Sequence, residues 1–515
     1  MKKILILFIV LAILTCGCNP NGSGGTTPNV QIPTGPAPTA PTEPSVPSGP
    51  PAVDPDQCTE HKDVNNDGYC DDCYTFLIVY VDFYSINDLH GKFVDNDSQP
   101  GVDELTTYLK NAREEDDYAF FLSAGDMWQG GAESNITKGQ IITDWMNELD
   151  FTSMTIGNHE FDWSSEYIKK NAEIAEFPFL AINIYDRKTN ERVDYCDASV
   201  VVEAGGLQIG IIGAIGDHYG SIAEAKCKDV YFKTGSQLTE LVKEESTRLK
   251  NQGVDFIVYV IHGDGADYDY ALSSSGYVNL VFEGHTHQGY TKRDNYGVYH
   301  LQNKGDNTDG ISHVEIQINS VTNAFTVKEA GQIIKFEFDY LDDDPLITEL
   351  LEKYKEELSI VYDDLGYNRT YRDDTDIEAL VAKLYYQKGV ERWGDKYDIV
   401  LGGGSFNTRS PYNLYAGTVT YAHLMSLLPF DNDIALCAVK GSVLKNKFFN
   451  NGSYNLYYET YGQSVKNNID SNATYYIIAD SWTYDYLDLT VVENYDFGIF
   501  ARDLLADYIR NGGFA

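Results

Sequence analysis

The chain has 515 residues, with 38 Lys plus Arg against 78 Asp plus Glu, which gives a formal net charge of −40 at pH 7. A field of this sign repels nucleic-acid backbones, so nucleic acid is excluded as a partner bound by surface charge. Apolar residues make up 43% and aromatic residues 13% of the chain, enough to build the cores of about two to four domains and too much for a disordered protein.

The N-terminus has the pattern of an export signal. Two lysines precede an apolar run over residues 4–14, and Gly17 stands directly before Cys18. A positive start, a short apolar stretch and a small residue before the cysteine predict a cleaved signal peptide over residues 1–17. The pattern resembles a bacterial lipoprotein signal, which implies that Cys18 carries lipid and anchors the exported protein at the cell surface or the periplasmic face of a membrane. A plain secretory signal and a retained anchor are the alternatives.

Residues 18–57 have the composition of a linker. Residues 19–57 contain eleven of the sixteen prolines and neither Lys nor Arg. Such a stretch cannot bury apolar surface and favours extended, polyproline-like conformations. It is expected to hold the folded part of the protein away from the membrane.

A short Cys/His/Asp-rich segment follows over residues 58–75. Cys58 with His61 and Cys70 with Cys73 form CxxH and CxxC pairs, and these four ligands together suit a structural zinc ion. The same segment has the spacing of the first half of a calcium-binding EF-hand loop, but Tyr74 stands where the bidentate glutamate is needed. Oxidised cysteines or an unstructured spacer are alternatives outside the cell. No catalytic role is expected for this segment.

Five apolar runs in the next part of the chain end in polar side chains. From residue 76 onward, short β-branched and aromatic runs alternate with helix-like stretches, which predicts a layered α/β fold. The five runs occupy residues 76–87, 119–124, 151–157, 254–261 and 280–283. Open α/β sheets place their sites on the loops that follow such strands.

The side chains on these loops fit two adjacent divalent ions, such as zinc or manganese. Asp126 can bridge two ions because a carboxylate has two oxygens. The spacing of Asp88 from His90, and of His285 from His287, lets one short loop present two ligands. Five of the ten histidines of the chain lie on these loops.

The order of these motifs resembles a known superfamily. Asp-x-His, Gly-Asp, Gly-Asn-His-Glu-x-Asp, His and Gly-His-x-His follow one another as in the calcineurin-like metallophosphoesterases. The forms at residues 87–91, 123–126 and 157–162 are similar to the branch of 5′-nucleotidases, UDP-sugar hydrolases and 2′,3′-cyclic phosphodiesterases. The resemblance covers residues 76–515. It implies a four-layer β-sandwich flanked by helices over residues 76–340, followed by a second α/β substrate-binding domain over residues 341–515.

The resemblance also implies roles for individual residues. One metal ion would be held by Asp88, His90, Asp126 and His287. The other would be held by Asp126, Asn158, His262 and His285. His159 and Asp162 would form the catalytic dyad, with His159 donating a hydrogen bond or proton while a metal-bridging hydroxide attacks phosphorus in line. A purely structural role for His159 is the alternative.

The C-terminal part is expected to select the substrate. Residues 333–338 read as a strand and residues 346–361 as a helix, with the domain boundary at the acidic turn between them. Residues 399–411 resemble a substrate-binding block of the family, and Leu401 replaces its asparagine. The resemblance implies that the substrate is contacted by Gly403, Gly404, Arg409, Phe430 and Asn158. The second aromatic of a base clamp would come from Trp482, Tyr484 or Tyr486.

The sequence therefore predicts an exported, metal-dependent phosphohydrolase that releases phosphate from nucleotides, above all from nucleoside 5′-monophosphates. A nucleotide-sugar or 2′,3′-cyclic-nucleotide phosphodiesterase is the alternative within the same chemistry. A non-catalytic surface module that binds a ligand is the alternative outside it. A serine hydrolase is not expected, because no G-x-S-x-G motif occurs.

Overall fold

The structure is a computed structural model. It describes residues 47, 51–93, 101–222, 224–304, 310–338, 340–404, 408, 413–450, 452, 454–496 and 498–514. The expected signal peptide, the lipidation site Cys18 and most of the linker lie outside these residues, as does Arg409. Among the helices of the described ranges, none has both the length and the apolar character that a membrane span requires.

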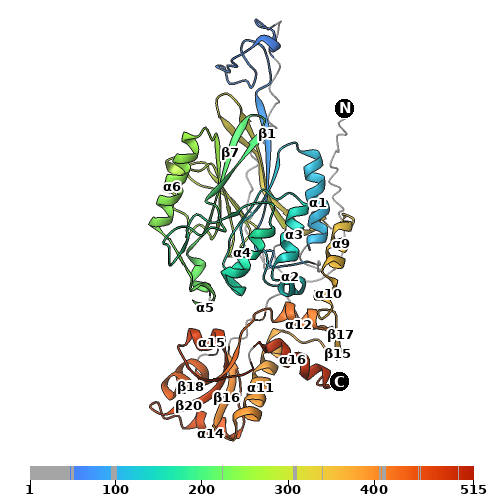
Figure 1. Ribbon diagram of the computed structural model, residues 1–515, viewed down its shortest axis with the longest axis vertical. Coiled ribbons are helices and arrows are strands. Elements are labelled where there is room, and N and C mark those ends of the chain that lie inside the picture. The colour runs from blue at the N-terminus through green and yellow to red at the C-terminus, as the bar shows by residue number, and fades with distance from the viewer. Residues whose placement is uncertain are drawn as a thin grey trace, which may run out of the picture. The chain divides into compact units, whose positions relative to one another are not determined.

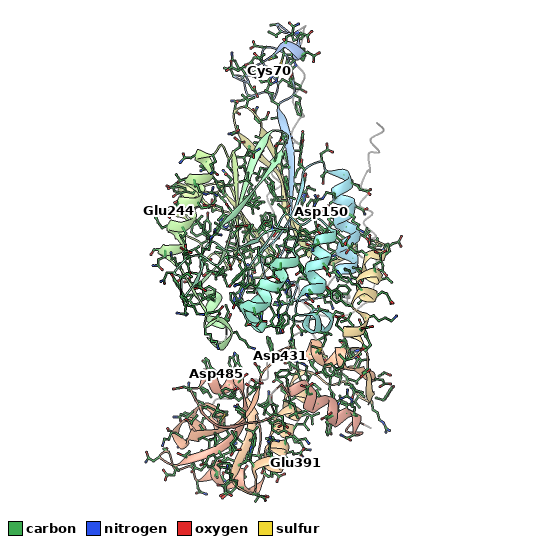
Figure 2. All side chains as sticks on the ribbon, in the orientation of Figure 1. Cys70, Asp150, Glu244, Glu391, Asp431 and Asp485 are labelled. Carbon is green, nitrogen blue, oxygen red and sulfur yellow. The ribbon has the colours of Figure 1, made fainter. Side chains whose placement is uncertain are left out.

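The first of two large sheets carries the N-terminal strands. Its order is β14 (Phe325–Ile334), β13 (Gly310–Asn319), β1 (Ile78–Ile86), β2 (Ala119–Ser123), β3 (Ser153–Thr155) and β4 (Phe179–Leu180). Strands β1 to β4 are parallel, and β13 and β14 pair antiparallel on the other side of β1. A small folded segment that includes Cys70 precedes β1 (Figure 2).

The second large sheet has a parallel centre with antiparallel edges. Its order is β11 (Tyr290–Arg293), β12 (Tyr299–Gln302), β10 (Leu280–Glu283), β9 (Phe256–His262), β7 (Leu207–Ile215) and β6 (Ser199–Ala204). The four middle strands are parallel. A separate ribbon pairs β5 (Ile184–Asp186) with β8 (Val230–Phe232).

The two sheets pack face to face and are covered by helices. Val81 and Phe83 of β1 join a buried cluster with side chains of β7 and β9, whereas Tyr84 and Ile86 belong to the cluster on the helical side. This alternation is the period of a strand buried on both faces. Helices α1 (Val102–Glu115), α3 (Gln140–Glu148) and α4 (Ser165–Ile174) cover the first sheet, and α6 (Ser236–Asn251) covers the second (Figure 1). The predicted four-layer arrangement is confirmed.

The C-terminal part forms a second α/β structure, as predicted. Its five-stranded sheet has the order β19 (Asn455–Tyr457), β16 (Ile399–Gly404), β20 (Thr474–Asp480), β18 (Ile434–Lys440) and β21 (Thr490–Asn494). Helix α11 (Asp374–Trp393) packs so closely on β16 that a Cβ atom at Gly402 would lie 2.4 Å from the backbone nitrogen of Tyr386. A two-stranded ribbon joins β15 (Asp364–Asn368) to β17 (Gly417–Thr420).

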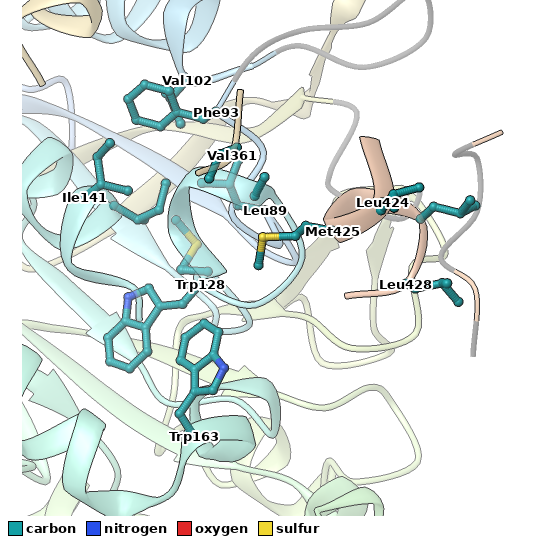
Figure 3. Packing of buried hydrophobic residues seen from close by; sticks show 14 of the residues in the cluster. Leu89, Phe93, Val102, Trp128, Ile141, Trp163, Val361, Leu424, Met425 and Leu428 are labelled. Carbon is teal, nitrogen blue, oxygen red and sulfur yellow. The ribbon is translucent and has the colours of Figure 1, made fainter. Parts of the chain in front are cut away.

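A continuous apolar cluster connects the two parts of the chain. Leu424 and Met425 of α12 (Tyr421–Leu427) belong to the same buried cluster as Leu89 and Trp128, which flank the loops after β1 and β2 (Figure 3). Helix α12 packs against α2 (Ala132–Thr137). The loop that follows α12, which contains Phe430, is therefore held against the layer that carries Asp88 and Asp126.

The strand expected over residues 333–338 is wrong. Strand β14 ends at Ile334, and Lys335–Phe338 form a helical turn, α8. The Glu337 carboxylate accepts a hydrogen bond from the backbone nitrogen of Ile334 at 2.9 Å, and this cap ends the strand. The helix expected next is split into α9 (Pro345–Lys353) and α10 (Lys355–Leu358), and the Asp344 carboxylate caps α9.

Candidate active site

The ends of five strands meet at one edge of the two sheets. Asp88 and His90 follow β1, Asp126 follows β2 and Asn158 follows β3, while His262 ends β9 and His285 and His287 follow β10. The structure brings ligand atoms to within 4.8 Å of one another in three groups. These groups are Asp88, His90 and His287; His90, Asp126 and His159; and Asp126, His262 and His285. Asp126 belongs to two of these groups, one with His90 and His159 and the other with His262 and His285.

The donor atoms converge at short distances. The Nε2 atoms of His90 and His287 lie 3.4 Å apart, and His287 Nε2 is 3.2 Å from Asp88 Oδ1. Around Asp126, the Nε2 atom of His262 is 3.1 Å from Oδ2. The Oδ1 atom of Asn158 is 3.1 Å from His262 Nε2 and 2.8 Å from His285 Nδ1. The seven predicted ligands thus form two neighbouring sets of oxygen and nitrogen donors.

Hydrogen bonds from outside the donor sets fix two of the imidazoles. The Nδ1 atom of His90 lies 2.9 Å from the carbonyl oxygen of Gln129, and that of His262 lies 2.8 Å from the carbonyl oxygen of Ala124. A carbonyl oxygen only accepts, so each Nδ1 carries the proton. The Nε2 atom of each ring is then the one that turns its lone pair toward the donor sets, as metal ligands require.

The loops are also tied together across the two sheets. The backbone N–H of His285, after β10, donates to both carboxylate oxygens of Asp88, after β1. The backbone N–H of His159, after β3, donates to Asp126 Oδ1 at 2.8 Å. The carboxylates are therefore positioned by backbone groups of neighbouring loops, before any ion is considered.

Five of the seven predicted ligands adopt a left-handed backbone. The φ angles are 53° for Asp88, 50° for His90, 55° for Asp126, 80° for His285 and 54° for His287. Non-glycine residues adopt this region rarely and at a cost of about 1–3 kcal/mol each. So many strained residues in one place indicate that the surrounding sheets hold these side chains in a required geometry.

Two glycines allow the loops to approach one another. A Cβ atom at Gly157 would lie 2.2 Å from Asp126 Oδ1. Gly125 has φ of +91°, and a Cβ atom there would lie 2.7 Å from His262 Nδ1. Any side chain at these positions would push Asp126 or His262 out of place.

The charges of the site suit divalent cations. Asp88 and Asp126 are buried, with exposed fractions of 0% and 1%, and their ion-pair partners include the imidazoles of His287 and His262. Burial alone would raise the pKa of Asp126, but His262 and His159 hold that pKa well below its ordinary value. Two buried carboxylates, imidazole nitrogens and one amide oxygen are ligands that suit ions such as zinc or manganese. The residues present therefore fit two metal ions.

Glu160 supports the site and was not singled out from the sequence. Its fully buried carboxylate accepts hydrogen bonds from the backbone nitrogens of Asp126 at 3.0 Å, Met127 at 2.8 Å and Gly157 at 2.8 Å. Burial and the nearby charge of Asp126 raise the pKa of Glu160 to about 7. The residue type gives no signal of this role, because all three contacts are to backbone nitrogens, two of them on the loop after β2.

Replacing Glu160 with glutamine is expected to weaken metal binding. The amide NH₂ of glutamine would face backbone N–H donors, so one of the three hydrogen bonds is lost and the loop that carries Asp126 shifts. Loss of such a supporting contact typically lowers metal affinity or activity about 10- to 100-fold. Metal titration of Glu160→Gln measures this, with Glu245→Gln as the matched control because Glu245 bonds Ser199 and Arg248 elsewhere. Equal loss in both variants would contradict a specific role for Glu160.

The predicted dyad is formed beside the donor sets. His159 Nδ1 and Asp162 Oδ2 lie 2.8 Å apart, so the carboxylate accepts the Nδ1 proton and orients the ring. The ring centroids of His159 and His90 are 5.1 Å apart. His159 is thus held at the edge of the donor sets rather than in the core behind them.

A cavity of about 240 Å³ opens in front of the dyad. Its lining includes His159, Asp162 and His285 together with the aromatic side chains of Phe430 and Trp482. The ring of Phe430 lies 5.9 Å from that of His159. Lys226, a residue outside the sequence motifs, adds a cationic side chain to the lining.

Gly403 and Gly404 lie within strand β16, and neither is among the described residues that line the cavity. A Cβ atom at Gly404 would lie 2.6 Å from Asp480 Oδ2 and one at Gly403 would lie 2.6 Å from Leu456 Cδ2. The packing of the sheet therefore accounts for both glycines. Arg409, expected to contact substrate, lies outside the described residues.

The Phe430 loop is fixed by a buried arginine. Arg502 donates to the carbonyl oxygens of Leu428 and Phe430 and forms an ion pair with Asp431. Asp431 also pairs with Lys138 Nζ at 3.1 Å. Because Lys138 follows α2, this pair links the loop that carries Phe430 to the layer beneath the donor sets.

Comparison with known proteins accounts for both parts of the chain. Residues 82–289 match the calcineurin-like phosphoesterase family, and residues 357–489 match the 5′-nucleotidase C-terminal domain. All seven predicted metal ligands and the dyad lie within the first match. The Phe430 loop and Trp482 lie within the second match.

Similar proteins include an apyrase of Tabanus yao, 26% identical over 406 residues, which cover 70% of this chain and 72% of that protein. Protein UshA of Yersinia enterocolitica is 23% identical over 431 residues, which cover 72% of this chain and 76% of that protein. A 5′-nucleotidase precursor from Thermus thermophilus has the same fold, with a TM-score of 0.65 and 17% identity, over 84% of this chain and 96% of that chain. The chain therefore belongs to the calcineurin-like phosphoesterases that carry a 5′-nucleotidase C-terminal domain, and it is a metal-dependent phosphoester hydrolase of the 5′-nucleotidase type.

Proposed function

We propose that this protein is an exported two-metal phosphohydrolase that releases phosphate from nucleotides, with nucleoside 5′-monophosphates as preferred substrates. Residues 76–340 form the catalytic domain, and residues 341–515 bind the substrate. The observation that carries the proposal is the shared position of Asp126 between two sets of donor atoms, with the His159–Asp162 dyad directly beside them.

In this proposal each metal ion has four protein ligands. The first ion is held by Asp88, His90, Asp126 and His287. The second ion is held by Asp126, Asn158, His262 and His285. The ions, when bound, supply polarisation of the phosphoryl oxygens and an activated water nucleophile.

The protein side chains supply position and protons. The carboxylate of Asp162 accepts the Nδ1 proton of His159 and so orients the ring. The proton that His159 gives to the leaving oxygen therefore comes from its Nε2 atom. The buried backbone contacts of Asp88 and Asp126 keep both carboxylates in place during turnover. A preorganised set of charges of this kind needs little rearrangement as charge develops on the phosphoryl group.

The aromatic rings that line the cavity are proposed to bind the nucleobase. Phe430 and Trp482 face the same cavity as the dyad and His285, and aromatic rings stack on flat bases regardless of their hydrogen-bonding edges. Arg409 and Asn158 are proposed as further substrate contacts, as the resemblance implies, whereas the packing of strand β16 accounts for Gly403 and Gly404. A base held at Phe430 would leave its 5′-phosphate directed at the donor sets.

Phe430→Ala is expected to raise the KM for nucleotides about 10-fold, because stacking of one base on one ring contributes about 1–3 kcal/mol. The kcat/KM for glycerol phosphate, which has no ring to stack, should stay within about twofold of the original value. Tyr461→Ala is a suitable control, since Tyr461 is exposed and is not among the described cavity-lining residues. Equal losses on both substrates would rule out a base-stacking role for Phe430.

Product analysis on a panel of substrates, which resolves inorganic phosphate, nucleosides and nucleoside monophosphates, tests the proposal, because opening a cyclic diester or cleaving a nucleotide sugar releases no inorganic phosphate. The panel contains 5′-, 3′- and 2′,3′-cyclic nucleotides, nucleotide sugars and glycerol phosphate, each with manganese, zinc or a chelator. Metal-dependent activity highest on 5′-monophosphates supports the proposal. Activity confined to cyclic nucleotides or nucleotide sugars would reassign the substrate, and no activity with metals bound would favour a ligand-binding module.

Export and anchoring rest on residues 1–18 and are proposed from their sequence pattern alone. If Cys18 carries lipid, Cys18→Ser should release the enzyme from the membrane fraction into the soluble fraction. Unchanged membrane association in that variant would rule out lipidation at Cys18.

A further inference from the structure

The segment before β1 folds into a small unit, residues 53–76, here called the N-terminal knuckle. Its backbone closes on itself, because the N–H of Val53 donates to the carbonyl of Asp72 and the N–H of Cys70 donates to the carbonyl of Thr75. Tyr69 and Phe76 form a β-bridge. The knuckle is distant in sequence from the candidate active site and has no part in the proposed mechanism.

Four potential ligands of the knuckle surround one point. The Sγ atom of Cys58 lies 3.9 Å from Cys70 Sγ and 3.5 Å from His61 Nδ1. The Sγ atom of Cys73 lies 3.3 Å from the same His61 nitrogen. A tetrahedral zinc site with Zn–S of about 2.3 Å and Zn–N of about 2.0–2.1 Å has S···S edges of about 3.8 Å and S···N edges of about 3.6 Å. The three observed distances lie within about 0.3 Å of the edges of such a tetrahedron.

The knuckle has too small a core to hold itself together by apolar burial. Its buried apolar cluster consists of Cys70, Cys73 and Leu77, the residue that directly follows the knuckle, with Val53 and Cys58 packed against them. Two of its three buried members are themselves potential ligands. Segments of this size with so little core need a disulfide or a metal ion to stay ordered, and the described cysteines are all thiols.

The acidic loop of the knuckle is occupied by internal hydrogen bonds rather than arranged for a cation. Asp63 is buried, and its carboxylate accepts from the backbone nitrogens of Asp67 at 3.0 Å and Gly68 at 2.9 Å. Asn319 Nδ2 donates to the same carboxylate at 2.6 Å. Both oxygens of Asp63 are thus used to shape the loop, which argues for zinc at the thiols and against calcium at the loop.

We propose that the three thiolates and the imidazole of the knuckle bind one Zn²⁺ as a structural site, separate from the catalytic metals, that fixes the knuckle to the start of β1. The Asp63–Asn319 bond joins the knuckle to the sheet, and the N–H of Leu77, directly before β1, donates to the carbonyl of Gly68. Asn319 ends β13, the strand that pairs with β1. The zinc ion therefore orders the point at which the linker enters the folded protein.

This site can be tested independently of catalysis. Strand β1 has nine residues, so its two ends are separated by about 26 Å at roughly 3.3 Å per residue. The knuckle precedes one end and Asp88 follows the other. Changes at the zinc ligands should therefore leave the chemistry of phosphate release unchanged.

Cobalt substitution in the whole chain is the experiment of choice. The proposed catalytic ligands are oxygen and nitrogen atoms, so a thiolate-to-cobalt charge-transfer band reports the knuckle alone. The reduced wild-type protein should show this band together with the strong visible bands of tetrahedral cobalt. Cys70→Ser combined with Cys73→Ser should abolish the band and lower the zinc content by one equivalent, with phosphatase activity retained.

Two further variants and one chemical probe complete the test. Cys227→Ser should keep the band, since Cys227 lies outside the knuckle, and His61→Cys should keep one zinc ion because a fourth thiolate replaces the imidazole. In the wild type, zinc should protect the three knuckle thiols from alkylation until a chelator is added. A reduced protein without a thiolate band, a disulfide among these cysteines, or protection by calcium alone would each overturn the proposal.

Discussion

Asp126→Asn is expected to lower kcat/KM by more than about 100-fold. Loss of a contact that only supports a metal ligand lowers metal affinity or activity about 10- to 100-fold. Asp126 is itself a proposed ligand, and it lies close to His90 as well as to His262 and His285. Asparagine offers one oxygen and no negative charge, so it cannot bridge two cations. Metal content measured by mass spectrometry should fall together with activity.

The Asp126→Asn substitution should leave the backbone conformation unchanged. Asp126 has φ of 55°, and asparagine is among the residues that adopt this region most readily. The thermal unfolding midpoint should therefore change little relative to Asp186→Asn, which alters a carboxylate in a surface turn. An Asp126→Asn protein that kept a tenth of its activity and both metal ions would falsify the bridging role.

His159→Ala is expected to lower kcat by about 100- to 10,000-fold, the range for loss of a general acid, while both metal ions remain bound. The backbone N–H of His159 still donates to Asp126 in this variant, so the donor sets keep their geometry. The loss should be smaller for p-nitrophenyl phosphate than for a nucleotide, because p-nitrophenolate departs without a proton. Steady-state kinetics on the two substrates measure the difference.

Asp162→Asn separates orientation from proton transfer. Its amide cannot accept the Nδ1 proton in the way that the carboxylate does, so His159 loses its fixed tautomer and kcat should fall less than in His159→Ala. His313→Ala serves as a control, because His313 pairs with Asp82 on the first sheet. If His159→Ala lost metal ions and affected both substrates equally, His159 would be a structural residue.

The positions of the catalytic groups could be predicted from the sequence because of how parallel strands end. Asp88, Asp126 and His262 each follow a recognisable apolar run, and the carboxyl ends of parallel strands share one edge of a sheet. The structure brings these residues together with the others of their motifs. The layers of the fold followed from the same alternation of strands and helices.

The supporting groups could not be predicted in this way. Glu160 acts through three backbone nitrogens and Arg502 through backbone carbonyls, and contacts of this kind leave no pattern of residue types. Lys226 reaches the cavity only because of tertiary packing. At residues 335–338 the alternation of polar and apolar residues favoured a strand, but the local cap by Glu337 decided for a helical turn.

The left-handed backbone at the donor positions restricts how this centre could be redesigned. Asp, Asn and His are the side-chain types that enter this region most readily after glycine, and they are also common ligands for divalent ions. Exchanges among these three residue types, such as His287→Asp to favour a harder ion, would change the metal ligands without changing the backbone conformation. Valine or isoleucine would incur the full conformational penalty there. The backbone conformation thus limits the useful substitutions at the donor positions to Asp, Asn and His, and new metal specificities for this scaffold would have to come from exchanges among these three residue types.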